Sequence, residues 1–439
     1  MFHNHFSALA ASLIALGVTV FATSPHWAQA AQAKSPTTID WPHFRFDEKH
    51  DGYQRFETTL NRNNVPQLSL LWQADLQGEL VYHSSPAVVN GVVYIGEDTG
   101  VLWAFPADGC GSDLCTAPLW KSTYLAQIVD SPTVVNGIVY VGSQTSFDSN
   151  DGKLNAFAAK GCGHKSECAP LWQGDAGKES ILESSPVYAN GVIFIGSYGG
   201  KLYAFNAEGC GKKLCQPLWT GKMGSTNSTA LVYKNVVYIG SNDGHLYAFN
   251  AEGCGKKSCN PIWTGDTHGA TFDSSPAVAN GIVYIGSAHA LSAFDASGCG
   301  AKTCTALWQA IDDEAFFDAS PAIYRGRVYL PWESQINIYD AKGCGKETCG
   351  PVAVLFGTGM QDAIASSPTI ANGVVYAGRN SGEILAWNAD CKGTCDQIWS
   401  RLLDDPIVNS SPTVVNGKIY IGGSNHGFSG RLYVLGLAQ

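Results

Sequence analysis

The feature that most constrains the fold of this chain is a repeat of about 45 residues that fills most of its length. One copy, SSPVYANGVIFIGSYGGKLYAFNAEGCGKKLCQPLWTG, runs from Ser184 to Gly221. It contains alternating apolar segments separated by short turns rich in Asn and Gly, a pattern that predicts four short β-strands in each copy. The eight copies begin at Ser84, Asp130, Ser184, Ser228, Ser274, Ala319, Ser366 and Ser410.

A four-stranded unit repeated in this way is typical of a β-propeller, in which each twisted sheet packs against its neighbours. The alternative is an open solenoid, which would need capping repeats. The eighth copy stops at Leu437 after its third strand, while an unpartnered strand-like segment, Leu68–Asp75, precedes the first copy. If that segment completes the last blade, no sheet edge is left open. We therefore expect an all-β, eight-bladed propeller of four-stranded antiparallel blades, closed by an N-terminal strand.

One tryptophan position recurs at the start of the fourth strand of each blade. Phe356 takes this position in the sixth copy. Because function seldom needs the same group in every blade, we expect these side chains to pack between blades. The tryptophans at this position are Trp72, Trp120, Trp172, Trp219, Trp263, Trp308 and Trp399.

The 14 cysteines fall into seven close pairs, one in each of the first seven copies. A zinc site usually needs two such pairs or added histidines, whereas these pairs stand about 45 residues apart. We therefore expect seven local disulfides, each reinforcing the outer hairpin of its blade. The expected pairs are Cys110/Cys115, Cys162/Cys168, Cys210/Cys215, Cys254/Cys259, Cys299/Cys304, Cys344/Cys349 and Cys391/Cys395.

The N-terminus has the pattern of an export signal, with an apolar run from Ala8 to Ala22 and small residues before Ala30 and Ala33. A membrane anchor is the alternative, but the run is shorter than the roughly 20 residues of a spanning helix. We expect a signal peptide over residues 1–33 and a single propeller domain over 34–439, exported to the periplasm or outside the cell as a monomer without a membrane anchor. The net charge of −10 and the lack of a basic run argue against nucleic acid as a partner.

The motif SSPxxxNGxxYxGxxxGxLYAFxA followed by LW resembles the pyrroloquinoline quinone (PQQ) repeat, and the resemblance extends from about Trp41 to Leu437. The segment that starts at Trp41 and contains Gly52 and Arg55 resembles the lead-in to the first blade of that family. The family includes PQQ-dependent alcohol dehydrogenases and propellers that bind no quinone. The dehydrogenases hold PQQ in the axial funnel, under a disulfide between adjacent cysteines, with a metal ion bound by Glu, Asn and Asp. This chain has neither an adjacent cysteine pair nor a CxxCH haem motif.

Residues that break the repeat are the candidates for function, and the first set lies three positions before the motif proline or its Ala230 equivalent. This position should face the central funnel, where gathered carboxylates can bind a cation or acquire a raised pKa. Asp130 adds a carboxylate one place along. The alternative is a polar, water-filled channel. The set comprises His83, Val129, Glu183, Asn227, Asp273, Asp318, Ala365 and Asn409.

A second set lies three residues after the Tyr or Phe of the second strand, where most copies have Ser or Gly. Glu97, Trp332 and Arg379 occupy it in the first, sixth and seventh copies. We expect this turn to open on the same mouth, where a Trp face and an Arg fork would suit a planar polyacid such as PQQ. Plain sequence divergence is the alternative.

Two functions follow from these patterns. The first is a non-catalytic exported propeller that binds a protein or small ligand at its funnel. The alternative is a PQQ- and calcium-dependent alcohol dehydrogenase, with Asp318 or Asp273 as the base, a metal on Glu183, Asn227 and Asp273, and the quinone contacted by Trp332, Arg379, Glu97 and His83. The missing cysteine pair and haem motif favour the first function.

Overall fold

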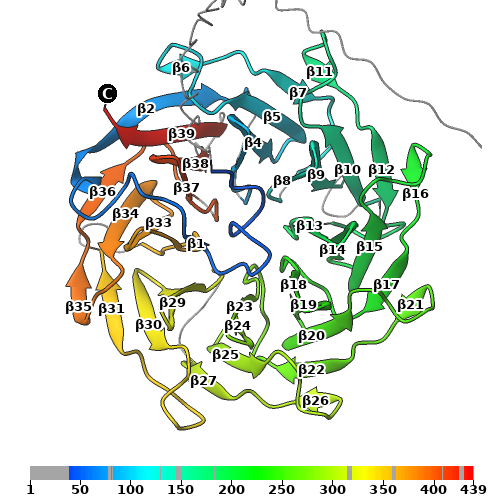
Figure 1. Ribbon diagram of the computed structural model, residues 1–439, viewed down its shortest axis with the longest axis vertical. Coiled ribbons are helices and arrows are strands. Elements are labelled where there is room, and N and C mark those ends of the chain that lie inside the picture. Colours follow the sequence, from blue (N-terminus) through cyan, green and yellow to red (C-terminus); the bar gives the residue numbers. More distant parts are fainter. Residues whose placement is uncertain are drawn as a thin grey trace, which may run out of the picture. The chain divides into compact units, whose positions relative to one another are not determined.

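Eight small sheets surround a common axis in the computed structural model, and each sheet forms one blade of a propeller (Figure 1). This confirms the all-β, eight-bladed fold expected from the repeat. None of the helical segments described is long and apolar enough to cross a membrane. The expected signal peptide lies outside the described residues, which are 39–438 without 78–80, 82, 129, 145–150, 182, 314–318, 358–361, 408 and 425–429.

The strands of each blade run antiparallel from the axis outward. The innermost strands are β3 (Ala87–Val89), β8 (Thr133–Val135), β13 (Val187–Ala189), β18 (Leu231–Tyr233), β23 (Ala277–Ala279), β28 (Ala322–Tyr324), β32 (Thr369–Ala371) and β37 (Thr413–Val415). The second strands are β4 (Val92–Glu97), β9 (Ile138–Ser143), β14 (Val192–Ser197), β19 (Val236–Ser241), β24 (Ile282–Gly286), β29 (Arg327–Trp332), β33 (Val374–Gly378) and β38 (Lys418–Ser424).

The outer half of each blade holds two further strands. The third strands are β5 (Val101–Pro106), β10 (Lys153–Ala158), β15 (Lys201–Asn206), β20 (His245–Asn250), β25 (Ala290–Asp295), β30 (Gln335–Asp340), β34 (Glu383–Asn388) and β39 (Gly430–Leu437). The fourth strands are β7 (Trp120–Ser122), β12 (Trp172–Asp175), β17 (Trp219–Lys222), β22 (Trp263–Asp266), β27 (Trp308–Ile311), β31 (Ala353–Phe356), β36 (Trp399–Leu402) and, in the eighth blade, β2 (Leu68–Asp75).

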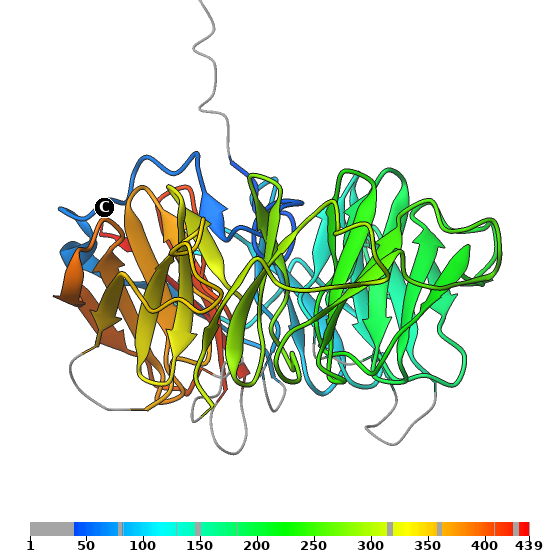
Figure 2. The same ribbon diagram turned by 90° about the horizontal axis from the view of Figure 1, so that it is seen from below.

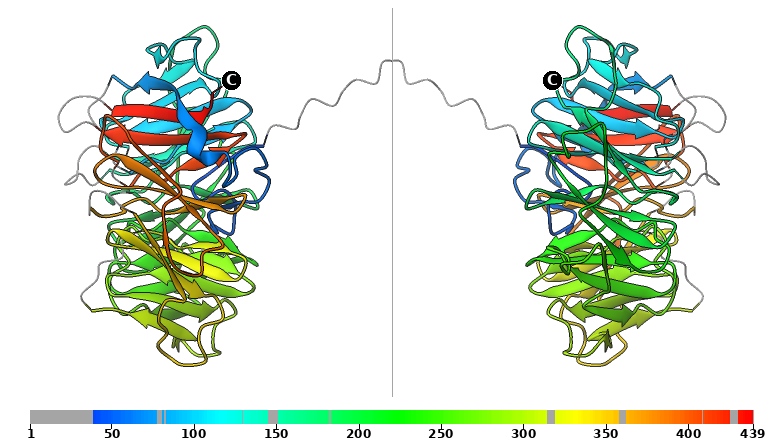
Figure 3. Two further views of the ribbon diagram at one scale, coloured as in Figure 1. Left: turned by 90° about the vertical axis from the view of Figure 1, so that its left-hand side faces the viewer. Right: turned by 90° about the vertical axis from the view of Figure 1, so that its right-hand side faces the viewer.

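The N-terminal strand closes the ring as expected. β2 pairs antiparallel with β39, from Leu68 opposite Leu437 to Asp75 opposite Arg431. Figure 3 shows these two strands, blue and red, side by side. Because the third and outer strands of the eighth blade come from distant parts of the sequence, no loop joins them.

The seven cysteine pairs form the expected local disulfides. Disulfides are typical of oxidising compartments. The loops reach further than the outer hairpin of their own blades, because each crosses to the preceding blade and pairs in parallel with its outer strand. For example, Ser258 and Cys259 lie opposite Thr220 and Gly221. The added strands are β6 (Leu114–Cys115), β11 (Glu167–Cys168), β16 (Leu214–Cys215), β21 (Ser258–Cys259), β26 (Thr303–Cys304) and β35 (Gly393–Asp396), with a single bridge from Thr348 to Gln309 in the sixth loop.

The repeated tryptophans pack between blades, as expected, and the cysteine loops explain their recurrence. A Cβ added to Gly253 would stand 2.7 Å from the Trp219 ring of the preceding blade, so the loop backbone lies directly on the indole. The expectation that Phe356 takes the tryptophan position of the sixth blade is wrong, because Ala353 lies opposite Ile338 as Trp219 lies opposite Ala204. The seventh loop, which crosses to this blade, has no glycine before its first cysteine. Loop and aromatic residue therefore vary together.

A closed ring of hydrogen bonds surrounds the axis. In each blade, the second residue of the SSP motif donates its backbone N–H to the side-chain hydroxyl of the corresponding residue in the next blade, at 2.9–3.1 Å. The last bond, from Ser411 to Ser85, joins the eighth blade to the first. The residues of this hydroxyl ring are Ser85, Ser131, Ser185, Thr229, Ser275, Ser320, Ser367 and Ser411.

The lead-in, residues 39–67, crosses the axis at one end of the propeller (Figure 2). It bonds to equivalent residues of five innermost strands and includes β1 (Tyr53–Gln54), which lies parallel to β32, and the 3-10 turn η1 (Val65–Gln67). The buried Arg45 guanidinium anchors it by donating to the carbonyls of Pro368 at 2.6 Å and Pro321 at 2.7 Å. The five strand residues bonded by the lead-in are Val88, Val134, Val278, Ile323 and Ile370.

Candidate functional site

A narrow cavity lies on the axis, where the loops leading to the innermost strands converge. Its volume is about 30 Å³. A water molecule or a single ion needs this much space. Phe44 of the lead-in lines it together with the hydroxyl ring, and the residues three positions before the motif proline complete the wall. The lining residues are Phe44, His83, Ser131, Glu183, Ser185, Asn227, Thr229, Asp273, Ser275, Ala365, Ser367 and Asn409.

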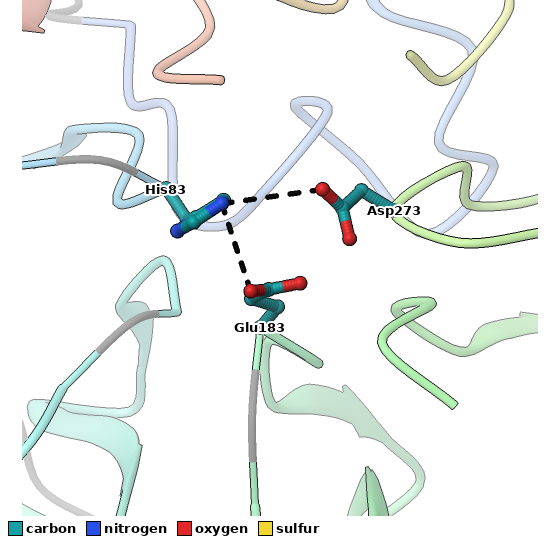
Figure 4. Close-up of side chains that lie close together, drawn as sticks. All are labelled: His83, Glu183 and Asp273. Atoms are coloured by element: carbon teal, nitrogen blue, oxygen red, sulfur yellow. Dashed lines mark ion pairs between the residues drawn. The ribbon is translucent and has the colours of Figure 1, made fainter. Parts of the chain in front are cut away.

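Three titratable side chains from different blades point toward one another in this cavity (Figure 4). The Nε2 atom of His83 lies 3.6 Å from Glu183 Oε1 and 4.0 Å from Asp273 Oδ2. One ligand atom from each residue lies within 4.8 Å of the other two. The first, third and fifth blades thus bring together residues separated by 190 positions.

Two amide side chains connect the carboxylates. Asn227 donates through Nδ2 to Glu183 Oε2 at 2.5 Å and to Asp273 Oδ1 at 3.2 Å. Asn409 donates to the other oxygen of Asp273 at 3.0 Å. The buried Oδ1 of Asn227 has no hydrogen-bond partner among the described residues. We call His83, Glu183, Asn227, Asp273 and Asn409 the channel cluster.

Burial and mutual repulsion set the protonation of the channel cluster. Desolvation, followed by the neighbouring Glu183, raises the pKa of Asp273 to about 8, although His83 and Asn227 act in the opposite direction. This raised pKa favours the protonated form of Asp273 at neutral pH. Glu183 has a φ of 58°, a left-handed conformation that is uncommon for residues other than Gly and Asn and that often occurs at binding sites.

The donor set suits a small cation. Two carboxylates and the free Asn227 Oδ1 offer oxygen ligands, which calcium prefers, and His83 adds a nitrogen. A cation would replace the proton on Asp273 and relieve the repulsion between the two carboxylates. The cavity bounded by the described residues does not fit the tricyclic quinone PQQ, whose pocket would have to approach the several hundred cubic ångströms usual for such ligands.

The second set of candidates does not line the cavity. Arg379 is fully buried and donates to Glu383 Oε2 at 2.8 Å and to the carbonyl of Gly357 at 3.0 Å. Glu97 is also fully buried, accepts a hydrogen bond from Thr99, and has a pKa raised by desolvation. Trp332 packs partly buried against the core between the fifth and sixth blades. Asp318 and Val129 lie outside the described residues.

Asp130 faces into its blade, contrary to the expectation that it adds a carboxylate to the funnel. It replaces the first serine of the SSP motif, whose hydroxyl in other blades accepts the N–H of the glycine in the second strand, as Ser84 does from Gly96 at 2.9 Å. Asp130 Oδ2 accepts the N–H of Gly142 at 2.6 Å, while the buried Oδ1 has no hydrogen-bond partner within the described part of the chain. Desolvation raises the pKa of Asp130 well above its usual value.

Sequence reasoning missed two parts of the cavity. Phe44 could not be predicted as a lining residue, because its position depends on how the lead-in crosses the axis, and no local sequence pattern indicates this. The hydroxyl ring had a signal, since the second residue of the SSP motif is Ser or Thr in every copy. A side chain that is constant in a repeat while its neighbours vary has a shared structural role.

The fold, the repeat and the axial cavity define an eight-bladed propeller of the PQQ-like class. The family described as outer membrane protein assembly factor BamB matches residues 150–297 and 254–438, and the chain belongs to this family. No curated protein sequence is similar enough to count as a match.

Solved structures share the fold at low sequence identity. A quinohemoprotein alcohol dehydrogenase from Comamonas testosteroni superimposes with a TM-score of 0.69 at 13% identity, over 92% of this chain and 81% of that one. The quinohemoprotein alcohol dehydrogenase ADHIIG from Pseudomonas putida HK5 gives 0.68 at 14%, over 91% and 80%. BamB from Moraxella catarrhalis gives 0.60 at 13%, over 84% and 97%.

Proposed function

We propose that this chain is an exported, non-catalytic propeller that binds a ligand at its central channel, and that the ligand held by the channel cluster is a small cation, with Ca²⁺ as the first candidate. One observation carries the proposal. Glu183, Asp273 and His83 converge in a cavity of about 30 Å³, which has room for an ion.

The chemistry of the channel cluster supports a cation over an organic ligand. Its groups come from loops fixed by the hydroxyl ring directly beside them, so their spacing is set by the fold. Phe44 limits the cavity on the side of the lead-in. Two carboxylates held together away from bulk water are stabilised by a positive charge between them, and a proton on Asp273 serves that purpose when no cation is bound.

The alternative, a PQQ-dependent dehydrogenase, has one supporting observation. Glu183, Asn227 and Asp273 gather as the Glu, Asn and Asp set that the family resemblance implies for a metal. The size of the cavity and the engagement of Arg379 by Glu383 weigh against quinone binding there. We therefore assign no redox step to this chain.

Thermal unfolding of the purified protein, with its disulfides intact and first treated with EDTA, tests the proposal. Ca²⁺ should raise the melting temperature, because a ligand that binds only the folded state stabilises it by about 2.7 kcal/mol at a hundred times Kd. Glu183→Gln and Asp273→Asn should largely abolish the shift. Glu208→Gln, which removes an exposed charge, is the matched control and should retain it.

Two results would overturn the proposal in different ways. An unchanged melting curve across Ca²⁺, Mg²⁺ and Zn²⁺ would exclude the cation site. Alcohol-dependent dye reduction after reconstitution with PQQ and Ca²⁺ would show a dehydrogenase. Export is tested separately by N-terminal sequencing of protein expressed with its full sequence, which should begin after Ala30 or Ala33.

A further inference from the structure

The part of the lead-in that spans the axis, residues 41–54, closes one end of the channel (Figure 2), and we call it the strap. Trp41 begins it and exchanges backbone hydrogen bonds of 2.6 and 2.8 Å with Val88 of the first blade. Phe44 then lines the axial cavity. Farther along, three strap carbonyls accept backbone N–H groups of innermost strands at 2.8–2.9 Å, namely Lys49 from Val278, Asp51 from Ile323 and Gly52 from Ile370.

The backbone of the strap is held in an unusual conformation. Three residues other than glycine have left-handed φ angles within six positions: Arg45 at 64°, Phe46 at 81° and His50 at 50°. Such residues are uncommon and persist only where the surrounding contacts enforce them. Loss of those contacts would therefore let the strap relax away from the axis.

His50 is the least satisfied side chain of the strap. It is 1% exposed, and neither of its ring nitrogens has a hydrogen-bond partner among the residues that the structure describes. The ring of His43 lies 5.9 Å away between centroids, and that of Phe44 meets it edge-on at 6.4 Å. Because buried polar groups are normally hydrogen-bonded, this arrangement needs an explanation.

The surroundings of His50 oppose an added proton. Desolvation, followed by the positive charges of His43 and Arg45, keeps the pKa of His50 well below its ordinary value. β23 and β28, whose backbones bond to the strap residues on either side of His50, contain no charged residue. The closed strap can therefore hold His50 only as the neutral imidazole.

We propose that the strap is an acid-released lid on the axial channel, and that protonation of His50, assisted by His43, favours its open form. Opening would expose the imidazole to water and withdraw Phe44 from the cavity, so that solvent enters from the side of the lead-in. Histidine is suited to this role because its charge changes near neutral pH. The inference does not depend on cation binding at the channel cluster.

The direction of the pH dependence follows from the protons bound in each form. The open strap protonates His50 below a pKa of about 6.5, so closure is fully favoured above that pH and weakens about tenfold for each unit below it. Desolvation also lowers the pKa of His43, which acts in the same direction. Desolvation raises the pKa of Asp51 to about 6 and that of Asp273 to about 8, and these two groups oppose opening because the closed form holds their protons.

Substitution of His50 isolates its contribution. Asparagine tolerates the left-handed backbone and does not titrate. Hydrogen exchange at the Val278 and Ile323 amides, which bond to the strap, measures opening in the full-length protein in EDTA. After correction for intrinsic exchange rates, His50→Asn should reduce opening about thirtyfold more at pH 5 than at pH 7.5. His164→Asn, which replaces an exposed histidine of the second cysteine loop, is the matched control and should change neither value.

Two further measurements separate release of the strap from unfolding. The Thr264 amide donates to the Lys302 carbonyl at 2.9 Å at the rim of the propeller, so its exchange should not follow that of the strap. His43→Asn, at a partly buried position, should reduce opening at pH 5 in the same direction as His50→Asn.

Two results would overturn the proposal. The first is an equal pH dependence of opening in the unaltered protein and in His50→Asn. The second is exchange at Val278 that changes in parallel with exchange at Thr264, because acid would then loosen the whole propeller and not the strap.

Discussion

The hydroxyl of Tyr329 donates a hydrogen bond to the backbone carbonyl of Ala389 in the next blade at 2.7 Å, while the buried hydroxyl of the equivalent Tyr376 has no hydrogen-bond partner among the residues that the structure describes. The same bond joins other neighbouring blades, for example Tyr284 to Ala341 at 2.7 Å. After the seventh blade, Leu437 stands at the alanine position, and it is paired with Leu68 of the closing strand. Closure of the ring thus removes one tyrosine contact.

Replacement of these two tyrosines should therefore have different effects. Tyr329→Phe should lower the free energy of unfolding by roughly 1 kcal/mol, because it leaves the Ala389 carbonyl unpaired. Tyr376→Phe should be neutral or stabilising, since it removes a buried hydroxyl that forms no hydrogen bond with any described residue. Urea unfolding of both variants measures the difference, and an equal loss in each would contradict it.

Asp130→Ser should stabilise the protein, most strongly at neutral and alkaline pH. The raised pKa of Asp130 means that the folded state holds a proton which the unfolded state releases above about pH 4. Stability linked to this group is thus complete below the unfolded pKa and declines as the pH rises toward the folded pKa. Serine should keep the hydrogen bond from the Gly142 N–H without burying an acid.

Chemical unfolding at pH 4.5 and pH 8 checks this prediction. The variant should gain roughly 1–3 kcal/mol at the higher pH, the usual cost of an unsatisfied buried polar group, and less at the lower pH. A gain that is the same at both would show that ionisation of Asp130 is not involved.

The sixth blade offers a paired exchange. It has Ala319 where six blades have the accepting serine and the second has Asp130, and Pro331 where the other blades have the donating glycine, so acceptor and donor are lost together. Ala319→Ser alone should not stabilise, because proline has no N–H. With Pro331→Gly, the double variant should show a favourable coupling of about 1 kcal/mol in a double-mutant cycle. Additive effects would contradict the pairing.

Two glycines of one cysteine loop make a matched test of the contact between loop and tryptophan. Gly253 and Gly255 both have positive φ, 81° and 71°, but only Gly253 lies against Trp219, since a Cβ on Gly255 would meet nothing within 4 Å. Both alanine variants incur the cost of a left-handed residue. Gly253→Ala should lose a further 1–3 kcal/mol or so through the steric clash. Equal melting temperatures would refute the contact.

The channel cluster should make stability and cation binding depend on pH in opposite ways. Because the pKa of Asp273 is raised to about 8, its contribution in EDTA is complete below about pH 4 and declines as the pH rises toward 8. Ca²⁺ must displace this proton, so its affinity should increase over the same range. Calorimetric titration at pH 6 and pH 8 measures this trend. Asp273→Asn should reduce the pH dependence of the melting temperature and leave the part that Asp130 contributes. An undiminished dependence in Asp273→Asn would assign it to other groups.

Most of the fold could be predicted from the sequence, because the same pattern of strands and turns occurs in eight copies. The alternation of apolar residues predicted the strands of each blade, and the short spacing within each cysteine pair predicted local disulfides. All five members of the channel cluster could be predicted because they occupy one repeat position. The crossing of the cysteine loops to the preceding blade could not, since it depends on contacts such as Gly253 with Trp219 that only the twist between blades creates.

Arg379 shows why the second set was harder to interpret. A charged residue where the repeat has Ser or Gly has the same appearance in sequence whether it faces a ligand or a partner within its own blade. Here the partner is Glu383, four residues along and across a tight turn. Burial of the guanidinium between β33 and the Gly357 carbonyl depends on residues from two blades, which local sequence does not specify.

The hydroxyl ring has the same hydrogen-bond geometry at the junction between the first and eighth blades as between blades joined by continuous chain. The bond from Ser411 to Ser85 spans the junction between the two ends of the propeller sequence, yet its length of 2.9 Å equals that of bonds between blades joined by continuous chain. The hydrogen bonds around the channel wall are therefore uninterrupted. The two ends of the propeller sequence meet only in the outer half of the eighth blade, between β39 and β2. A circular permutant, cut at another blade's outer hairpin and joined between β39 and β2, should keep the same channel.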